Sequence, residues 1–171
     1  MQSLSIPIDS IDAFVFDFDG VLTNNLVHLD QDGREHVSCS RADGIAFDLL
    51  RKIQKPAYIL STEKNSVVTA RANKLKILAI QGIANKVEAI KQLAEQEGFL
   101  LSNILYVGND LNDYRIMRLC GYTACPADSH EKIKEIANII LKTEGGKGVV
   151  RELLESVFKL NFIVNIFSYA E

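Results

Sequence analysis

Short apolar segments alternate with segments of helical periodicity along the chain. Apolar runs that predict buried strands occupy residues 13–16, 57–60, 77–80, 104–107, 122–124 and 139–141. Apolar residues recur every three or four positions in residues 43–53, 66–75, 85–97, 129–137, in a stretch ending at Cys120, and after Gly148. Strands that alternate with helices are typical of a parallel sheet covered by helices on both faces. The pattern predicts an α/β fold in a single domain spanning residues 1–171.

Two segments depart from this alternation. Residues 25–29 and 34–39 flank an Asp-Gln-Asp-Gly sequence, and Asp-Gly is a strong turn signal. We therefore predict a β-hairpin over about residues 25–39, projecting beside the end of the first strand. The C-terminal tail, about residues 159–171, is apolar, and such a patch is expected to be covered by another molecule.

The first predicted strand ends in two closely spaced carboxylates. Asp17 and Asp19 follow residues 13–16 directly, and side chains two positions apart on an extended chain point the same way. Gly20 comes next, as expected where the chain turns sharply or a ligand comes close. Two like charges are costly together unless a cation lies between them. An isolated Asp-x-Asp is more often a solvated turn or a helix cap, so the rest of the chain must decide.

Composition excludes several classes of function. The 171 residues carry a net charge of −3, with 47% hydrophobic and 24% charged residues, and no basic stripe that would bind nucleic acid. The three cysteines are widely spaced and form no Cys-x-x-Cys pair, so neither a disulfide framework nor a zinc site is expected. No apolar run reaches the roughly 18 residues that a membrane span needs. The first residues lack the pattern of a signal peptide, and we expect a cytoplasmic protein.

Polar side chains also follow the other predicted strands. Ser61 follows the second strand, Lys86 begins the helix after the third, and residues 109–113 (Asn-Asp-Leu-Asn-Asp) follow the fourth. The carboxyl ends of parallel strands converge on one crevice, so these groups are expected to meet Asp17 and Asp19 there. A hydroxyl, an amine and several carboxylates around a metal suit a phosphate group. Considered alone, Lys86 could be a solvated lysine at the start of a helix, and Ser61 could be an ordinary turn or capping serine without a function.

Four motifs together resemble the haloacid dehalogenase superfamily. They are Asp-Phe-Asp-Gly-Val at 17–21, a Ser after the second strand, Gln-Gly-Ile-Ala-Asn-Lys at 81–86 and Gly-Asn-Asp-Leu-Asn-Asp at 108–113. More narrowly, nearly the whole chain, including the Gly-Gly-Lys-Gly-Val-Val-Arg-Glu segment at 145–152, resembles the capless phosphatases of 3-deoxy-octulosonate 8-phosphate and related nine-carbon sugar acids. The resemblance implies a three-layer Rossmann-like fold with a hairpin flap and no cap domain, Mg²⁺ as cofactor and a small sugar-acid phosphate as substrate.

The resemblance also implies a role for each motif residue. Asp17 would attack phosphorus and form an aspartyl-phosphate, with Mg²⁺ bridging it and the phosphate. Asp19 would protonate the leaving group and then activate water. Ser61 would donate a hydrogen bond to a phosphoryl oxygen, and Lys86 would neutralise charge developing there.

The first departure from the family pattern concerns the metal site. Its members usually have an aspartate ligand after Gly108, where this chain has Asn109. An amide oxygen can bind Mg²⁺ but carries less charge, so metal affinity is expected to be weaker. The predicted metal set is Asp17, Asp19 and Asn109, supported by Asp110 and Asp113. Ligation by Asp110 in place of Asn109 is the alternative.

The second departure concerns the substrate. The octulosonate phosphatases typically read Thr-Gly-Arg after the second strand, whereas this chain reads Ser61-Thr62-Glu63, with Lys74 one helix later. A Glu here with a downstream Lys resembles relatives that act on nine-carbon, sialic-type acids and the domains fused to sialic-acid cytidylyltransferases. An exposed ion pair of little consequence between Glu63 and Lys74 is the alternative.

Further substrate contacts are expected from Arg41, Asp43 and Arg151, in addition to Thr62. Arg151 resembles an arginine that capless relatives place near the substrate, often from a neighbouring subunit. Since no cap domain fits in this length, the resemblance implies a homotetramer in which hairpins and C-terminal tails of neighbours cover the site.

Two other classes of function compete with the phosphatase. A binding or regulatory module associated with a cytidylyltransferase would keep the fold with weak hydrolysis, as Asn109 and Glu63 hint. A phospho-receiver domain is also α/β with an acidic pocket, but it has no general acid two residues after its aspartate, and Asp19 argues against it. The sequence does not distinguish eight-carbon from nine-carbon substrates.

Overall fold

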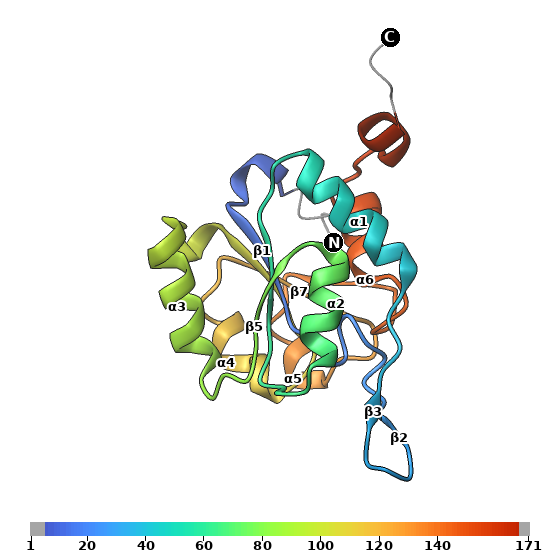
Figure 1. The fold of residues 1–171 in the computed structure, drawn as a ribbon. Helices are drawn as coiled ribbons and strands as arrows, with labels where there is room; N and C mark the ends of the chain where they lie inside the picture. Colours follow the sequence, from blue (N-terminus) through green and yellow to red (C-terminus); the bar gives the residue numbers. More distant parts are fainter. Residues whose placement is uncertain (1–5, 168–171) are drawn as a thin grey trace.

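The computed structural model describes residues 6–167, and its ribbon is shown in Figure 1. Six parallel strands form a sheet in the order β5-β4-β1-β6-β7-β8. They are β1 (Ala13–Phe16), β4 (Ala57–Leu60), β5 (Leu78–Ile80), β6 (Ile104–Val107), β7 (Tyr122–Cys125) and β8 (Ile139–Ile140). The predicted parallel α/β architecture is confirmed, and β1 lies between β4 and β6 inside the sheet.

Helices cover both faces of this sheet. They are α1 (Arg41–Lys52), α2 (Val67–Leu75), α3 (Lys86–Glu97), α4 (Tyr114–Met117), α5 (Glu131–Lys134) and α6 (Val149–Glu152). Helices α1, α2 and α6 pack on one face and α3, α4 and α5 on the other. Short 3₁₀ turns occupy Ile8–Ser10, Leu101–Asn103 and Leu111–Asp113, and π-helical turns occupy Leu153–Val157 and Ile163–Phe167.

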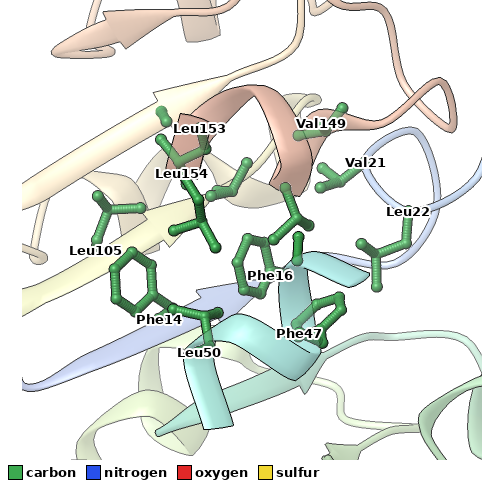
Figure 2. Packing of buried hydrophobic residues seen from close by; sticks show 14 of the residues in the cluster. Phe14, Phe16, Val21, Leu22, Phe47, Leu50, Leu105, Val149, Leu153 and Leu154 are labelled. Carbon is green, nitrogen blue, oxygen red and sulfur yellow. The ribbon is translucent and has the colours of Figure 1, made fainter. Parts of the chain in front are cut away.

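The alternation of side chains along β1 explains why a strand of only four residues is wholly buried. Phe14 and Phe16 point into the α1–α6 layer, as Figure 2 shows, whereas Ala13 and Val15 point into the α3–α4 layer. Phe16 meets the ring of Phe47 on α1 edge to face, with 5.3 Å between ring centroids. The strand that carries Asp17 and Asp19 at its carboxyl end is thus fixed from both sides.

Several predicted helix boundaries are wrong by one to three residues. Helix α1 begins at Arg41 and not at Asp43, because the Ser40 hydroxyl accepts a hydrogen bond from the amide of Ala42 and caps the helix. Helix α5 is capped by the ring of His130 and not by Ser129. These shifts leave the predicted order of elements unchanged.

Asp43 is buried and holds a distant part of the chain. Its Oδ1 accepts hydrogen bonds from the amides of Val150 (2.9 Å) and Arg151 (3.2 Å), at the start of α6. The other oxygen, Oδ2, is buried without a hydrogen-bond partner. Burial, which outweighs the two amide hydrogen bonds and the charge of Arg71, raises the pKa of Asp43 from 3.8 to about 6.

This raised pKa gives a measurable pH dependence of stability. A carboxyl that binds its proton more tightly when folded makes the protein less stable as pH rises between the unfolded and folded pKa values. Between pH 4 and 6, the free energy of unfolding should therefore lose a contribution of about 3 kcal/mol from Asp43. The D43N variant should show a flatter profile in urea titrations over this range. An unchanged slope would show that Asp43 keeps an ordinary pKa.

The predicted hairpin is present but shorter than expected. Strands β2 (His28–Leu29) and β3 (Glu35–His36) pair antiparallel in a sheet of their own and project from the body of the molecule in Figure 1. Asp30 closes the turn by accepting hydrogen bonds from the amides of Asp32 and Arg34. Apolar side chains on the hairpin are exposed, Leu29 to 67%.

The segment before α6 packs directly on the loop that follows β1. A Cβ added to Gly145 would lie 2.2 Å from the carbonyl oxygen of Gly20, and one added to Gly146 would lie 2.4 Å from the amide nitrogen of Asn24. The amide of Gly146 donates to the carbonyl of Val21 at 3.0 Å. Only glycine permits this backbone contact between the first and last thirds of the chain.

The cysteines, the lengths of the helices and the C-terminal tail bear on the remaining expectations from the sequence. Cys39, Cys120 and Cys125 are all free thiols. None of the helices formed by residues 6–167 combines the length and the apolar character that crossing a membrane demands. The predicted apolar tail is described up to Phe167, and its last residues, 168–171, lie outside the described residues.

Candidate active site

A cleft of about 360 Å³ opens at the carboxyl end of the sheet. Its lining comes from the loops after β1, β4 and β6: Asp17, Asp19, Asn25, Thr62, Asn109, Asp110, Leu111 and Asn112. The convergence of parallel strand ends therefore brings Asp17, Asp19, Asn109 and Asp110 together, although they are far apart in sequence. Ser61, Lys86 and Asp113 are not among the residues that line the cleft.

Asp17 lies at the buried end of the cleft and is only 3% exposed. Its Oδ1 accepts a hydrogen bond from the amide of Phe18 at 2.7 Å and lies 2.9 Å from Nζ of Lys86. Burial first, and Asp113 second, raise the pKa of Asp17 to about 8 despite Lys86. A further cation in the cleft would lower this pKa and favour the ionised carboxylate.

Lys86 is placed by the start of α3. The Asn85 side chain caps this helix by accepting from the amides of Val87 and Glu88, which fixes Lys86 as the first helical residue. Its ammonium lies 2.6 Å from Oδ1 of Asp113, as well as close to Asp17. Burial alone would lower the pKa of Lys86, but the two carboxylates outweigh it and raise the pKa. The lysine is a buried, permanently charged group at the end of the cleft.

Asp113 is fully buried, and both of its oxygens are engaged. Oδ1 accepts from Lys86 and from the hydroxyl of Tyr106 (2.7 Å), and Oδ2 accepts from the amides of Asn109 (2.9 Å) and Asp110 (3.5 Å). The residue does not line the cleft. This geometry favours a positioning role for Asp113 over the ligand role proposed from the sequence. The close approach depends on Gly108, where a Cβ would lie 2.6 Å from Cγ of Asp113.

Asn109 presents an unsatisfied polar atom at the cleft. Its side-chain oxygen is buried without a hydrogen-bond partner, whereas its side-chain nitrogen packs against Gly20, where an added Cβ would lie 1.9 Å away. An unpaired buried oxygen costs about 1–3 kcal/mol unless a ligand meets it. Asn109, Asp17 and Asp110 all line the cleft, and their side-chain oxygens are the kind of ligand that a hard divalent cation such as Mg²⁺ prefers.

Asp19 lies beside Asp17 but is half-exposed to the cleft. Burial, then the nearby charges of Glu63 and Glu35, raise its pKa, which Lys86 and a hydrogen bond with Thr23 partly oppose. An acid in this environment holds its proton more readily than an ordinary aspartate. Asp19 is therefore suited to donate a proton to a group in the cleft.

The loop after β4 forms another wall of the site. Ser61 is 1% exposed, and its hydroxyl accepts from the amide of Glu63 at 3.1 Å. Thr62 is exposed and lines the cleft. Glu63 lies in the turn before α2, where its side-chain oxygen accepts hydrogen bonds from the amides of Lys64 (2.6 Å) and Asn65 (2.7 Å).

The other predicted substrate residues lie outside the cleft lining. Arg41 is exposed at the start of α1, and Asp43 is only 1% exposed, so the prediction that Asp43 reaches the sugar is corrected to a structural role under α6. Lys74 lies on α2 in a separate hollow with Glu35 and Arg71, and within residues 6–167 it forms no salt bridge with Glu63. Arg151 stacks 4.0 Å from the Phe162 ring.

Asn25 and Tyr106 were not identified from the sequence, and Leu111 and Asn112 were identified only as part of the 108–113 motif. Asn25, Leu111 and Asn112 line the cleft. The hydroxyl of Tyr106 contacts Lys86 and Asp113. Tyr106 has the only polar side-chain atom of the strand Ile104–Val107, and a buried hydroxyl needs a hydrogen-bond partner, so the sequence did contain an indication of its contact with a polar group. Asn25 has a positive φ of 61°, but nothing in its local sequence indicates that it faces the cleft.

Solved structures of similar fold cover almost the whole chain. A protein of Streptomyces avermitilis assigned to the HAD family of hydrolases has a TM-score of 0.88 and 39% identity, over 98% of this chain and 92% of that one. The 3-deoxy-D-manno-octulosonate 8-phosphate phosphatase of Moraxella catarrhalis, in complex with magnesium, phosphate and KDO, has a TM-score of 0.86 and 27% identity, over 94% and 92%.

Sequence comparisons agree with the structural ones. The 3-deoxy-D-manno-octulosonate 8-phosphate phosphatase KdsC of Escherichia coli K12 is 29% identical over 148 residues, which cover 86% of this chain and 79% of that protein. A family model described as haloacid dehalogenase-like hydrolase matches residues 45–153, more than half of the chain. The resemblance seen in the motifs is confirmed, and the chain belongs to the haloacid dehalogenase-like hydrolases.

Proposed function

We propose that this protein is a Mg²⁺-dependent phosphatase that hydrolyses the phosphate monoester of a 2-keto-3-deoxy sugar acid through an aspartyl-phosphate on Asp17. The observation that carries the proposal is that Asp17 lines one cleft with Asn109, whose side-chain oxygen is unpaired, and contacts the buried ammonium of Lys86 at 2.9 Å. The relatives of this chain include phosphatases of 3-deoxy-D-manno-octulosonate 8-phosphate, which supports the substrate class.

The contacts of Asp17 support its role as the nucleophile. Its side-chain contacts within the described residues are made by Oδ1, with Lys86 and the amide of Phe18, which leaves Oδ2 for the substrate. As the bond from Oδ2 to phosphorus forms, the bond from phosphorus to the sugar oxygen breaks. Magnesium held by Asp17 and Asn109, with Asp110 nearby, would supply the charge that offsets repulsion between carboxylate and phosphate.

Asp19 transfers the protons of both half-reactions. Its carboxyl proton passes to the departing sugar oxygen, and the resulting carboxylate then takes a proton from the water that attacks phosphorus. The raised pKa of Asp19 supports the first of these roles. Lys86 and the Ser61 hydroxyl offset charge on the phosphoryl oxygens, and release of phosphate returns Asp17 to its starting state.

The choice between eight-carbon and nine-carbon substrates depends on the loop after β4. An arginine there would attract the carboxylate that eight- and nine-carbon substrates both carry, so charge alone does not decide between them. Glu63 supports the nine-carbon, sialic-type acids through its resemblance to the relatives that act on them. A panel of eight- and nine-carbon sugar-acid phosphates, assayed with Mg²⁺ for phosphate release, tests the proposal. Turnover of a simple aryl phosphate without turnover of any sugar-acid phosphate would reject the substrate class, and no turnover of either would favour the binding module.

Replacing Asn109 by aspartate tests the metal site. The N109D variant should reach half-maximal activity at a lower Mg²⁺ concentration, because a carboxylate adds a negative charge where the unpaired amide oxygen now lies. Calorimetric Mg²⁺ titration of the two proteins provides the affinity independently of turnover. Equal affinities would exclude Asn109 as a ligand and leave Asp110 as the alternative.

We further propose a homotetramer in the cytoplasm. The cleft has no cap domain above it, and exposed apolar side chains on the hairpin and the tail are available for contacts between subunits; they include Leu26 (59%), Leu29 (67%), Ile163 (75%) and Phe167 (54%). The three free thiols support a reducing compartment. A monomeric mass by light scattering at micromolar concentration would contradict the assembly.

A further inference from the structure

The ammonium group of Lys86 has three partners and therefore no free N–H in this structure. Its nitrogen lies 2.6 Å from Oδ1 of Asp113, 2.9 Å from Oδ1 of Asp17 and 3.3 Å from the hydroxyl oxygen of Tyr106. A lysine ammonium carries three donors, so these three acceptors use them all. A phosphoryl oxygen can accept a hydrogen bond from Lys86 only if one partner gives up its place.

Tyr106 is the partner that is easiest to replace. Its oxygen is the most distant of the three acceptors and the only uncharged one, and hydrogen bonds to charged acceptors are about twice as strong as neutral ones. The Tyr106 hydroxyl also donates its own proton to Oδ1 of Asp113 at 2.7 Å. That second bond does not involve Lys86 and stays in place when the ammonium turns away.

We propose that Tyr106 is a positioning residue for the phosphatase reaction, whose hydroxyl holds the third N–H of Lys86 until a phosphoryl oxygen replaces it. The proposal rests on the role of Lys86 in the proposed function. In the resting site, the hydroxyl is the third acceptor of the ammonium and keeps it within reach of both Asp17 (2.9 Å) and Asp113 (2.6 Å). When substrate arrives, Lys86 exchanges a weak neutral acceptor for an anionic one and keeps both carboxylates.

The surroundings of Tyr106 support a role beyond filling space. The side chain is fully buried on β6 among the apolar residues that support α3 and α4, so its ring cannot move the hydroxyl elsewhere. Asp113, the acceptor of its proton, also holds the amides of Asn109 and Asp110. The phenol thus contacts the group that fixes both the cation of the site and the loop proposed to bind metal.

The Y106F variant removes the hydroxyl and keeps the ring. Without the hydroxyl, Oδ1 of Asp113 has Lys86 as its one remaining donor and draws the ammonium away from Asp17. With a chromogenic aryl phosphate and saturating Mg²⁺, we expect kcat to fall about tenfold and KM to change less than about threefold, because Lys86 acts mainly on charge that develops in the transition state. The affinity for orthovanadate, measured calorimetrically, should fall with kcat.

A matched control and a double variant separate positioning from structural support. Y122F makes the same change on the neighbouring strand β7, at a hydroxyl that makes no hydrogen bond within residues 6–167, and should leave kcat unchanged. In a K86M background, Y106F should cost less than about twofold in orthovanadate affinity, since coupled residues are not additive.

Three results would overturn the proposal. The first is a kcat of Y106F within about twofold of that of the unaltered protein. The second is a Y106F variant that lowers only the melting temperature. The third is a fall in orthovanadate affinity that is as large when Y106F is added to K86M as when it is made alone. Each is distinct from failure of the proposed function, which would appear as absence of turnover by the unaltered protein.

Discussion

Asp17→Asn should abolish turnover of any phosphate ester, with a loss of roughly 10⁴- to 10⁶-fold in kcat. An amide in place of the carboxylate cannot form the bond to phosphorus, and the residue has no substitute, since Asp19 is needed for proton transfer. The measurement is phosphate release with Mg²⁺, together with trapping of phosphoenzyme by acid quench. The unaltered protein should yield acid-stable, hydroxylamine-labile phosphate, and D17N should yield none.

The control for this variant is the same substitution at an exposed aspartate. Asp9 lies in the turn before β1 and is exposed, so D9N should retain full activity. D17N should also remain folded, because it removes one of two carboxylates that share Lys86 and relieves the repulsion from Asp113. Residual phosphoenzyme in D17N would show that another residue is the nucleophile.

Lys86→Met is expected to reduce both activity and stability. Loss of the cation should lower kcat by about 10²- to 10³-fold, as for removal of one transition-state donor. It also leaves Asp17 and Asp113, which are 3% and 0% exposed, without their shared partner. Removing one member of a buried ion pair costs about 3–5 kcal/mol. Urea unfolding monitored with EDTA should show a loss of this size.

Added Mg²⁺ should restore part of the stability of K86M, because a cation held by Asp17 replaces half of the lost charge compensation. Lys91→Met on the same helix is the matched control, since Lys91 is exposed and has no partner in this site. A K86M protein with unchanged urea midpoint in EDTA would mean that one carboxyl of the pair is protonated and that Lys86 contributes no net stability.

The fold could be predicted from the sequence because each of its elements has a local pattern. The buried run of β1, the caps of α3 and the Asp-Gly of the hairpin all depend on neighbours in sequence. The π-helical turn at Leu153–Val157 follows α6, and the amides at the start of α6 are held by Asp43, which is more than a hundred residues earlier in the chain. Such contacts leave no periodic signal in the chain.

The candidate site could be predicted as a set of residues but not as a set of contacts. Asp17, Asp19, Lys86 and Asn109 follow strand ends, and parallel strands bring such ends together. Whether a carboxylate faces the cleft or the protein interior depends on rotamers and on single close approaches. Asp113 turned inward because Gly108 leaves room for it, and Tyr106 became its partner through the register of β6.

The contact between Gly145 and the carbonyl of Gly20 has a consequence for synthesis of the chain. The loop that carries Asp19 receives its last backbone support from a segment translated more than a hundred residues later. A nascent chain can form the first strands early, but we expect the loop that carries Asp19 to reach its final geometry only after residues 145–148 leave the ribosome. Activity should therefore appear late in translation, and a prematurely terminated product should carry the first motif without activity.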